Sequence, residues 1–194
     1  MITIYRKSCP GKFWLVVGIL LVFLLAACGP VLVSQQGSQG QATTPPAKTS
    51  GGGPTSQEQQ LAQYLFGLIN HDRVAMGLAA YSWNAALARG GRLHDMRMVA
   101  YGQLSHQCPG EPDLGTRITN DGLVWRAAGE NIGWSNNPDP QQGVLSVHQG
   151  MMAEKPPDDG HRVNILSTSF TLVGVDVLID SQQGVWLTED FAQL

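Results

Sequence analysis

The chain has 194 residues, which is room for one domain or two small ones once any targeting segment is set aside. Its formal net charge is −3, and removal of residues 1–27 would leave nine basic and fifteen acidic side chains, a charge of −6. A surface of that charge is a poor partner for nucleic acid, so we expect no nucleic acid among its ligands.

The first 27 residues have the pattern of a lipoprotein signal peptide. Arg6, Lys7 and Lys12 precede an uncharged run over 13–27 that is rich in Leu, Val and Phe. The run ends in Leu-Ala-Ala-Cys, which resembles a bacterial lipobox, in which Cys28 carries the lipid and becomes the first mature residue. Ordinary cleavage, or an uncleaved apolar anchor, stays open. Each alternative places the remaining residues outside the cytoplasm.

Residues 28–55 are expected to form a flexible tether. From Val33 onward this segment is built of Gln, Gly, Ser, Thr and Pro with almost no apolar residues. Such a composition cannot bury enough surface to order itself. A tether of this length has a reach of about 25 to 30 Å, which would keep a domain at 56–194 near the membrane.

Two helices are predicted at the start of this domain. Ser56 with Gln59 three residues later has the spacing of a capping box, which indicates a first helix over 57–76. Asn84 can cap a second helix that runs to Tyr101. Gly90-Gly91 weakens the second helix unless another backbone packs closely there.

Two more helices and three strands follow. A short helix is expected over 114–120, and Asp139-Pro140 begins a helix with a buried stripe of Val144, Val147, Met151 and Met152. The segment 124–134 predicts a strand, and the runs 171–180 and 184–193 predict a hairpin. The expected fold is α/β, an α/β/α sandwich with a small, mainly antiparallel three-stranded sheet flanked by helices.

The cysteines limit how this domain is stabilised. Cys9 lies in the basic leader and Cys28 is the predicted lipid site, so Cys108 is the single cysteine of the domain. An internal disulfide cannot form there, and the fold must hold through its core.

The five histidines differ in their settings. His71 is expected to be solvated or to cap a helix, and His148 is placed on the polar side of its helix. His94 is expected to be a buried structural histidine bonded to a neighbour. His106 and His161 lie in loop-like segments, where scaffolds display functional side chains.

Two glutamates have comparable settings. Glu130 stands before a strand-like segment, and Glu154 ends the fourth helix before a double proline. Two imidazoles with two carboxylates could bind a divalent cation such as zinc, or could form an acid/base set. They come from four separate segments, so periodicity does not show that they meet.

An ordered set of motifs adds a resemblance. The set is Leu104-Ser105-His106, Gly129-Glu130-Asn131-Ile132, Gly160-His161-Arg162-Val163-Asn164-Ile165-Leu166, Val173-Gly174-Val175 and Trp186-Leu187-Thr188-Glu189-Asp190-Phe191. It resembles the bacterial, SCP-like branch of the CAP superfamily, which includes cysteine-rich secretory proteins, venom antigens and plant pathogenesis-related proteins. The resemblance covers about Leu61 to Phe191.

The resemblance implies a tetrad at the floor of a cleft. It assigns His106, Glu130, Glu154 and His161 as the residues of a divalent metal site, with zinc as the first candidate. The longer turn before His161 departs from the family pattern and bears on Glu154. His94 matches a second-helix position whose implied role is packing.

Three functions remain open from the sequence. The first is a membrane-tethered binding module whose cleft holds a divalent metal and a small lipid, peptide or cell-envelope component. The second is an extracytoplasmic hydrolase, for which no catalytic residue is assigned, because neither Ser105 nor Cys108 has a recognisable nucleophile context. The third is a purely structural polar network.

Overall fold

A computed structural model describes residues 5–6 and 53–194. Almost all of the predicted signal peptide, the lipid site Cys28 and nearly all of the tether lie outside these residues. The described helices are α1 (Ser56–Ala75), α2 (Ala85–Tyr101), α3 (Leu114–Asn120), α4 (Pro140–Ala153) and α5 (Gly160–Ile165). The described strands are β1 (Tyr5–Arg6), β2 (Ser82–Trp83), β3 (Ala127–Ser135), β4 (Leu172–Ile179) and β5 (Val185–Gln193). None of the described helices combines the length and the apolar character needed to cross a membrane.

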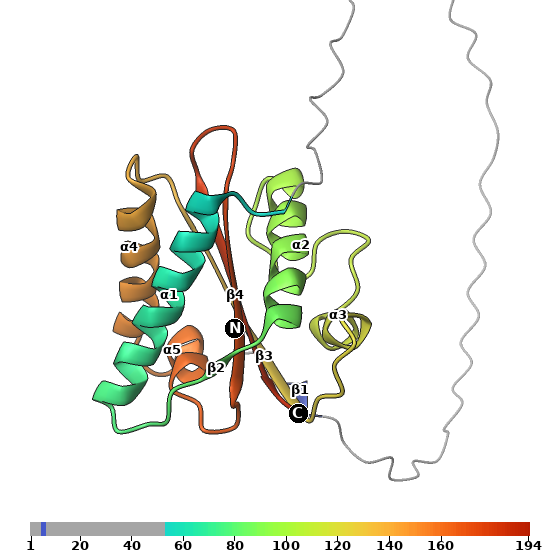
Figure 1. The fold of residues 1–194 in the computed structure, drawn as a ribbon, viewed down its shortest axis with the longest axis vertical. Coiled ribbons are helices and arrows are strands. Elements are labelled where there is room, and N and C mark those ends of the chain that lie inside the picture. Colours follow the sequence, from blue (N-terminus) through green and yellow to red (C-terminus); the bar gives the residue numbers. More distant parts are fainter. Residues whose placement is uncertain (1–4, 7–52) are drawn as a thin grey trace, which may run out of the picture. The chain divides into compact units, whose positions relative to one another are not determined.

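The strands form one sheet with helices on both faces. Its order is β1-β3-β5-β4-β2, and each neighbouring pair is antiparallel except β2 with β4. Helices α1, α4 and α5 cover one face, while α2 and α3 cover the other (Figure 1). The prediction of an α/β/α sandwich with a mainly antiparallel sheet is confirmed.

The strand count was predicted too low. Three long strands are present as expected, but two-residue strands flank them on both edges. A two-residue strand is too short to show an alternating pattern in sequence. β1 pairs with Ala127 and Ala128 and falls within the predicted signal peptide. A chain cleaved before Cys28, as predicted, would therefore keep the other four strands.

Helix caps follow the predicted chemistry with one shift of register. The N-cap of α1 is Thr55, whose side chain accepts from the backbone N–H of Glu58 at 3.2 Å, while Glu58 accepts from the backbone N–H of Thr55 at 2.7 Å. The expected pair, Ser56 and Gln59, is therefore wrong by one residue. Asn84 caps α2 as predicted, and α3 has its predicted bounds.

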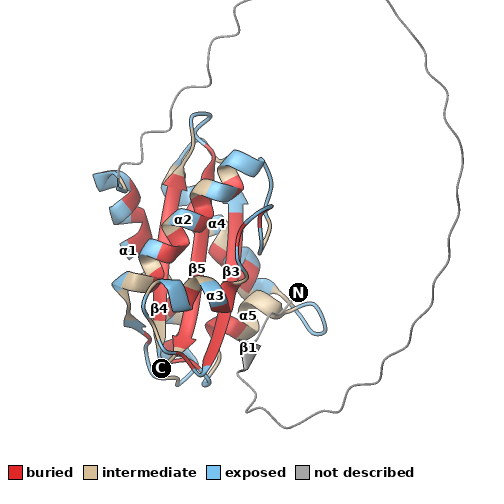
Figure 2. Cartoon of the chain, turned by 90° about the vertical axis from the view of Figure 1, so that its right-hand side faces the viewer, coloured by how far each residue is buried: buried red, intermediate tan, exposed pale blue. Residues whose placement is uncertain are grey.

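Strands β3, β4 and β5 are largely buried (Figure 2), and the side chains that their two faces bury differ in chemistry. Towards α1 and α4 the sheet packs a large apolar cluster that includes Leu65, Ile69 and Phe191. Towards α2, the same strands bury Asp176 and Thr188 beside smaller apolar groups. Because strand side chains alternate between faces, the layer towards α1 and α4 is mainly apolar apart from Asn131 and Glu189, whereas the layer towards α2 buries several ionisable groups.

Close packing of α2 on the sheet explains Gly174 of β4. A Cβ added at Gly174 in β4 would lie 2.2 Å from the backbone nitrogen of Ala88 and 2.3 Å from Leu87 Cβ. We expect Gly174→Ala to lower the free energy of unfolding by about 2–3 kcal/mol, since α2 must move away from the sheet. Chemical denaturation would measure this loss. Gly150→Ala, on an open face of α4, is the matched control, and an equal loss in both variants would contradict the packing argument.

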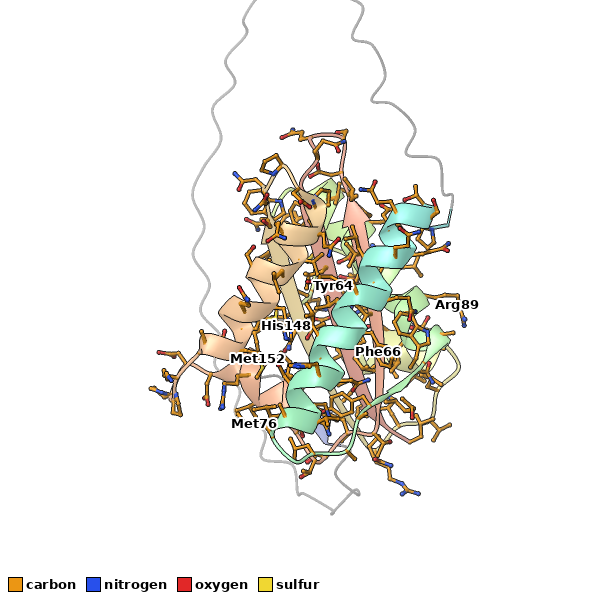
Figure 3. The ribbon with its side chains drawn as sticks, turned by 60° about the vertical axis from the view of Figure 1, so that its left-hand side comes forward. Tyr64, Phe66, Met76, Arg89, His148 and Met152 are labelled. Carbon is orange, nitrogen blue, oxygen red and sulfur yellow. The ribbon has the colours of Figure 1, made fainter. Side chains whose placement is uncertain are left out.

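His148 corrects a second prediction. It is 2% exposed, and its Nε2 lies 2.9 Å from Asp72 Oδ2 on α1 (Figure 3). His148 follows Val144 by four residues and so lies on the buried face of α4, not on the polar side. Burial lowers the pKa of His148 against the opposing effect of Asp72.

Candidate functional site

The first predicted pair, His106 and Glu130, is in contact. His106 follows α2 in the loop before α3, and its Nδ1 lies 2.8 Å from Glu130 Oε1. Glu130 is buried in β3, whereas the side chain of His106 is 34% exposed. Its Nε2 makes no hydrogen bond to any described residue, so this nitrogen is available to a ligand.

A network of buried charged and polar side chains contacts Glu130. Arg117 of α3 donates from Nη2 to Glu130 Oε2. His94 of α2 places Nε2 at 3.6 Å from the same carboxylate oxygen, and Glu111 lies 2.9 Å from His94 Nδ1. Carboxyl and imidazole groups thus alternate from Glu111 through His94 and Glu130 to the partly exposed His106.

The charges of this network are set by burial and by Arg117. Burial by itself raises the pKa of Glu130, but the hydrogen bond from His106 and the charge of Arg117 outweigh it, and the pKa is lowered. Burial and the neighbouring Glu130 raise the pKa of Asp190 well above its ordinary value. The lowered pKa favours the ionised form of Glu130, whereas the raised pKa favours the protonated form of Asp190.

The second predicted pair, His161 and Glu154, is also in contact. Glu154 is the C-cap of α4, and its Oε1 lies 2.5 Å from His161 Nδ1. The other oxygen accepts the backbone N–H groups of His161 at 3.0 Å and Arg162 at 3.3 Å. His161 lies in α5, not in the loop that its proline-rich approach suggested. The carboxylate therefore fixes both the start of α5 and the orientation of the imidazole.

Two asparagines join the pairs across the sheet. Asn131 donates from Nδ2 to the backbone carbonyl of His161 at 3.1 Å and to Glu189 at 2.8 Å. Asn164 donates to Asn131 Oδ1 at 2.9 Å and to the backbone carbonyl of Glu130 at 3.3 Å. Successive residues of β3 face opposite layers, so Glu130 serves one pair while Asn131 serves the other.

A shallow groove of about 380 Å³ runs along β3 and reaches the second pair. Glu154 and His161 line it together with Leu104, Gly133 and Met151. His106 and Glu130 are not among its lining residues. The structure thus arranges the four predicted ligands as two imidazole–carboxylate pairs, and their sharing of a single ion stays a prediction.

One other group has metal-ligating side chains. Among the described residues, His94, Cys108 and Glu111 are the one set of three whose donor atoms lie within 4.8 Å of one another. Glu111 already accepts from the backbone N–H of Cys108 at 3.0 Å and lies 3.6 Å from Arg97. Burial, and then Glu111, raises the pKa of the Cys108 thiol. A protonated thiol beside a compensated carboxylate fits a hydrogen-bonded support for His94 better than a metal centre.

Sequence reasoning missed Arg117 and Glu111. Arg117 follows Leu114 by three residues and precedes Ile118, which places it on the buried face of α3. A cation at such a position signals a buried acid partner, since charges are rarely buried unpaired. His94 is buried as predicted, but it faces Glu130 and does more than fill space.

These features define a three-layered domain with paired histidines and glutamates. Residues 66–191 match the CAP family, described as the cysteine-rich secretory protein family, and the chain belongs to it. The family expected from the sequence is therefore confirmed. No curated protein matches the sequence.

Solved structures agree with this assignment. An extracellular protein containing an SCP domain from Bacillus anthracis has a TM-score of 0.61 and 26% identity, covering 74% of this chain and 45% of that one. An outer surface protein of Borrelia burgdorferi has a TM-score of 0.60 and 12% identity, covering 70% and 93%. A cysteine-rich secretory protein of Staphylococcus aureus has a TM-score of 0.56 and 20% identity, covering 73% and 40%. The chain therefore spans less than half of the Bacillus and Staphylococcus proteins.

Proposed function

We propose that this CAP domain binds a divalent metal ion, zinc first, through Nε2 of His106 and Nε2 of His161. The observation that carries the proposal is that each imidazole presents Nδ1 to a carboxylate and keeps Nε2 free of bonds to the described residues. A carboxylate at one ring nitrogen fixes the tautomer and raises the basicity of the other, as in many protein zinc sites. Glu130 and Glu154 then complete the site by orienting its two ligands.

The charges of the two pairs support a cation. Arg117 already compensates Glu130, so the first pair is close to neutral. Glu154 bonds to backbone N–H groups and to His161, with no Lys or Arg side chain against it among the described residues. The carboxylate of Glu154, which lines the groove beside His161, would therefore stabilise a bound cation more than Glu130 would.

We place the domain outside the cytoplasm, tethered by a lipid on Cys28. The support is the lipobox-like Leu-Ala-Ala-Cys sequence and the likeness to the extracellular Bacillus protein. On this proposal the groove beside β3 holds a small lipid, peptide or envelope component near the membrane surface.

Calorimetric titration of zinc into the purified chain tests the metal site. We expect His106→Ala and His161→Ala each to weaken binding by at least about tenfold, and Glu130→Gln and Glu154→Gln to weaken it by about 10- to 100-fold. Cys108→Ser is the matched control and should bind as the wild type does. Loss of binding in Cys108→Ser alone would move the ion to the group of His94, Cys108 and Glu111. Equal binding by all variants would remove the site.

Hydrolysis is the second candidate, favoured by one observation. The ionised Glu130 holds the half-exposed His106 as an acid/base dyad. Ser105 bonds to the backbone of Gln107 and not to this imidazole, so water would have to be the nucleophile. Turnover of peptide or ester substrates that disappears in His106→Ala would support this candidate, and its absence across such substrates would argue against it.

A further inference from the structure

A second cavity is lined by none of the residues of the two imidazole–carboxylate pairs. It has a volume of about 430 Å³ and forms where the end of α2, the end of β3 and the β4–β5 turn meet. Figure 1 shows the end of α2 and this turn at the same end of the domain. The volume falls in the range of about 300–1,000 Å³ that is usual for ligand sites. The cavity shares only Leu104 and Trp134 with the groove beside β3.

Two indoles form one wall of this cavity. The rings of Trp134 and Trp186 have centroids 6.1 Å apart and planes inclined by 58°. Trp186 is buried and donates from Nε1 to Asp180 at 2.8 Å, which fixes its position. Trp134 is 44% exposed, so a rigid inner ring supports an outer ring that is open to a ligand. A ring held in this way binds at low cost in conformational entropy.

The charge of the lining narrows the class of ligand. No Lys, Arg or His lines the cavity, so it offers no cation to a phosphate, a carboxylate or a nucleotide. The single acid, Asp180, already accepts from Trp186 Nε1 and from the backbone N–H groups of Gln182 and Gly184, each at 2.8 Å. A carboxylate that already accepts three hydrogen bonds does not require a bound cation to compensate it. The ligand that fits is therefore uncharged.

The remaining polar groups are neutral hydrogen-bonding side chains. Gln103, Ser181 and Gln182 are exposed at the rim, and their side chains make no hydrogen bond to the described residues. Amides and a hydroxyl can both donate and accept, which suits a ligand that carries many hydroxyl groups. The apolar face of a pyranose ring stacks on an indole while its hydroxyls reach groups at the side.

We propose that this cavity, built around Trp134, is a binding site for neutral saccharides. The sugar ring stacks on the exposed face of Trp134, and the rim amides bond to its hydroxyls. We expect sugar binding there to be separable from metal binding, because none of the four proposed metal-site residues lines the cavity, although Trp134 also borders the groove beside β3.

Tryptophan fluorescence and saturation-transfer NMR on the full chain, with tri-N-acetylchitotriose and maltotriose as probes, test the proposal. We expect a sugar-dependent change in emission in the wild type and about tenfold weaker binding in Trp134→Ala. Trp134→Phe keeps an aromatic ring and should retain part of the affinity. Tyr101→Ala is the control, because Tyr101 is also 44% exposed but does not line the cavity.

Further measurements distinguish sugar binding at this cavity from metal binding at the proposed metal site. His161→Ala should bind the sugars as the wild type does, whatever its affinity for zinc. No sugar response in the wild type at millimolar concentration, or unchanged binding by a folded Trp134→Ala, would overturn the proposal. A response to a proline-rich peptide in place of both sugars would also overturn it.

Discussion

Replacing Arg117 by alanine is expected to lower the free energy of unfolding by about 3–5 kcal/mol. Its side chain is 10% exposed and compensates Glu130, while its Nη1 lies 3.8 Å from Glu111. Removing the guanidinium leaves the ionised Glu130 buried without a counter-charge, and burying an unpaired charge is among the most costly changes in a protein. Denaturant unfolding monitored by circular dichroism would measure the loss.

Two further variants test whether the loss of stability comes from the missing counter-charge of Glu130. Arg97 also approaches Glu111, at 3.6 Å, but it is half exposed, so Arg97→Ala should cost no more than about 1 kcal/mol. Arg117→Lys restores the charge without the planar fork and should recover only part of the loss. If Arg117→Ala and Arg97→Ala cost the same, Glu130 is not the ionised acid of this network.

Glu189→Gln is expected to change how stability depends on pH. Burial raises the pKa of Glu189 to about 7, only partly offset by the hydrogen bond from Asn131. Between the ordinary pKa of 4.5 and this value, the folded protein holds a proton that the unfolded chain releases. The contribution of Glu189 is therefore fully present below pH 4.5 and is lost as pH rises through about 7. The loss amounts to about 3 kcal/mol.

The comparison between variants isolates this group. The pKa values of other buried acids are also raised; burial raises the pKa of Asp176 to about 6. Several groups therefore contribute to the pH dependence of wild-type stability. The midpoint temperature of thermal unfolding should fall less between pH 5 and 8 for Glu189→Gln than for the wild type. Asp113→Asn is the control, because hydrogen bonds from Thr116 lower the pKa of Asp113 and place its titration below this window. Parallel curves for wild type and Glu189→Gln would contradict the assignment.

Much of the fold could be predicted from local patterns. Asn84, Asp139 and Pro140 mark helix starts whose chemistry is local, and each acts as expected. Thr55 with Glu58 and Ser56 with Gln59 both have the spacing of a capping box, and the structure uses the first pair, whose Glu58 also accepts from the backbone N–H of Ile179 in β4. That contact spans 121 residues of sequence, so no window around the helix start could show it.

The polar layer under α2 could not be predicted from alternation alone. Asp176 alternates with the apolar Val175 and Val177, which is also the pattern of a sheet with one face in water, while Thr188-Glu189-Asp190 is a continuous polar run. The structure covers this face with α2, and Asp95 on that helix bonds to Thr188 at 2.6 Å. Alternation shows that the two faces differ, but it does not show which layer covers the polar one.

The candidate site came from the resemblance, because its spacing carries no local signal. His106 and Glu130 are 24 residues apart and meet only through the path of α3. Glu154 and His161 are seven residues apart across a turn, and the double proline made their contact harder to expect. Family motifs pointed to these four residues and to a packing role for His94, whereas Glu111 and Arg117 emerged only when α2 and α3 were placed against β3.

The opposite orientation of Glu130 and Asn131 restricts how this protein can vary. Pairing of Glu130 with Asp190 and of Asn131 with Glu189 sets which layer each side chain enters. Deletion of one residue in β3 ahead of Glu130 would turn Glu130 and Asn131 into the opposite layers, which would separate Glu130 from His106 and Asn131 from the backbone carbonyl of His161. A one-residue change inside β3 is therefore expected to disrupt both of these contacts, whereas the pair of Glu154 and His161, formed between α4 and α5, does not depend on the register of β3.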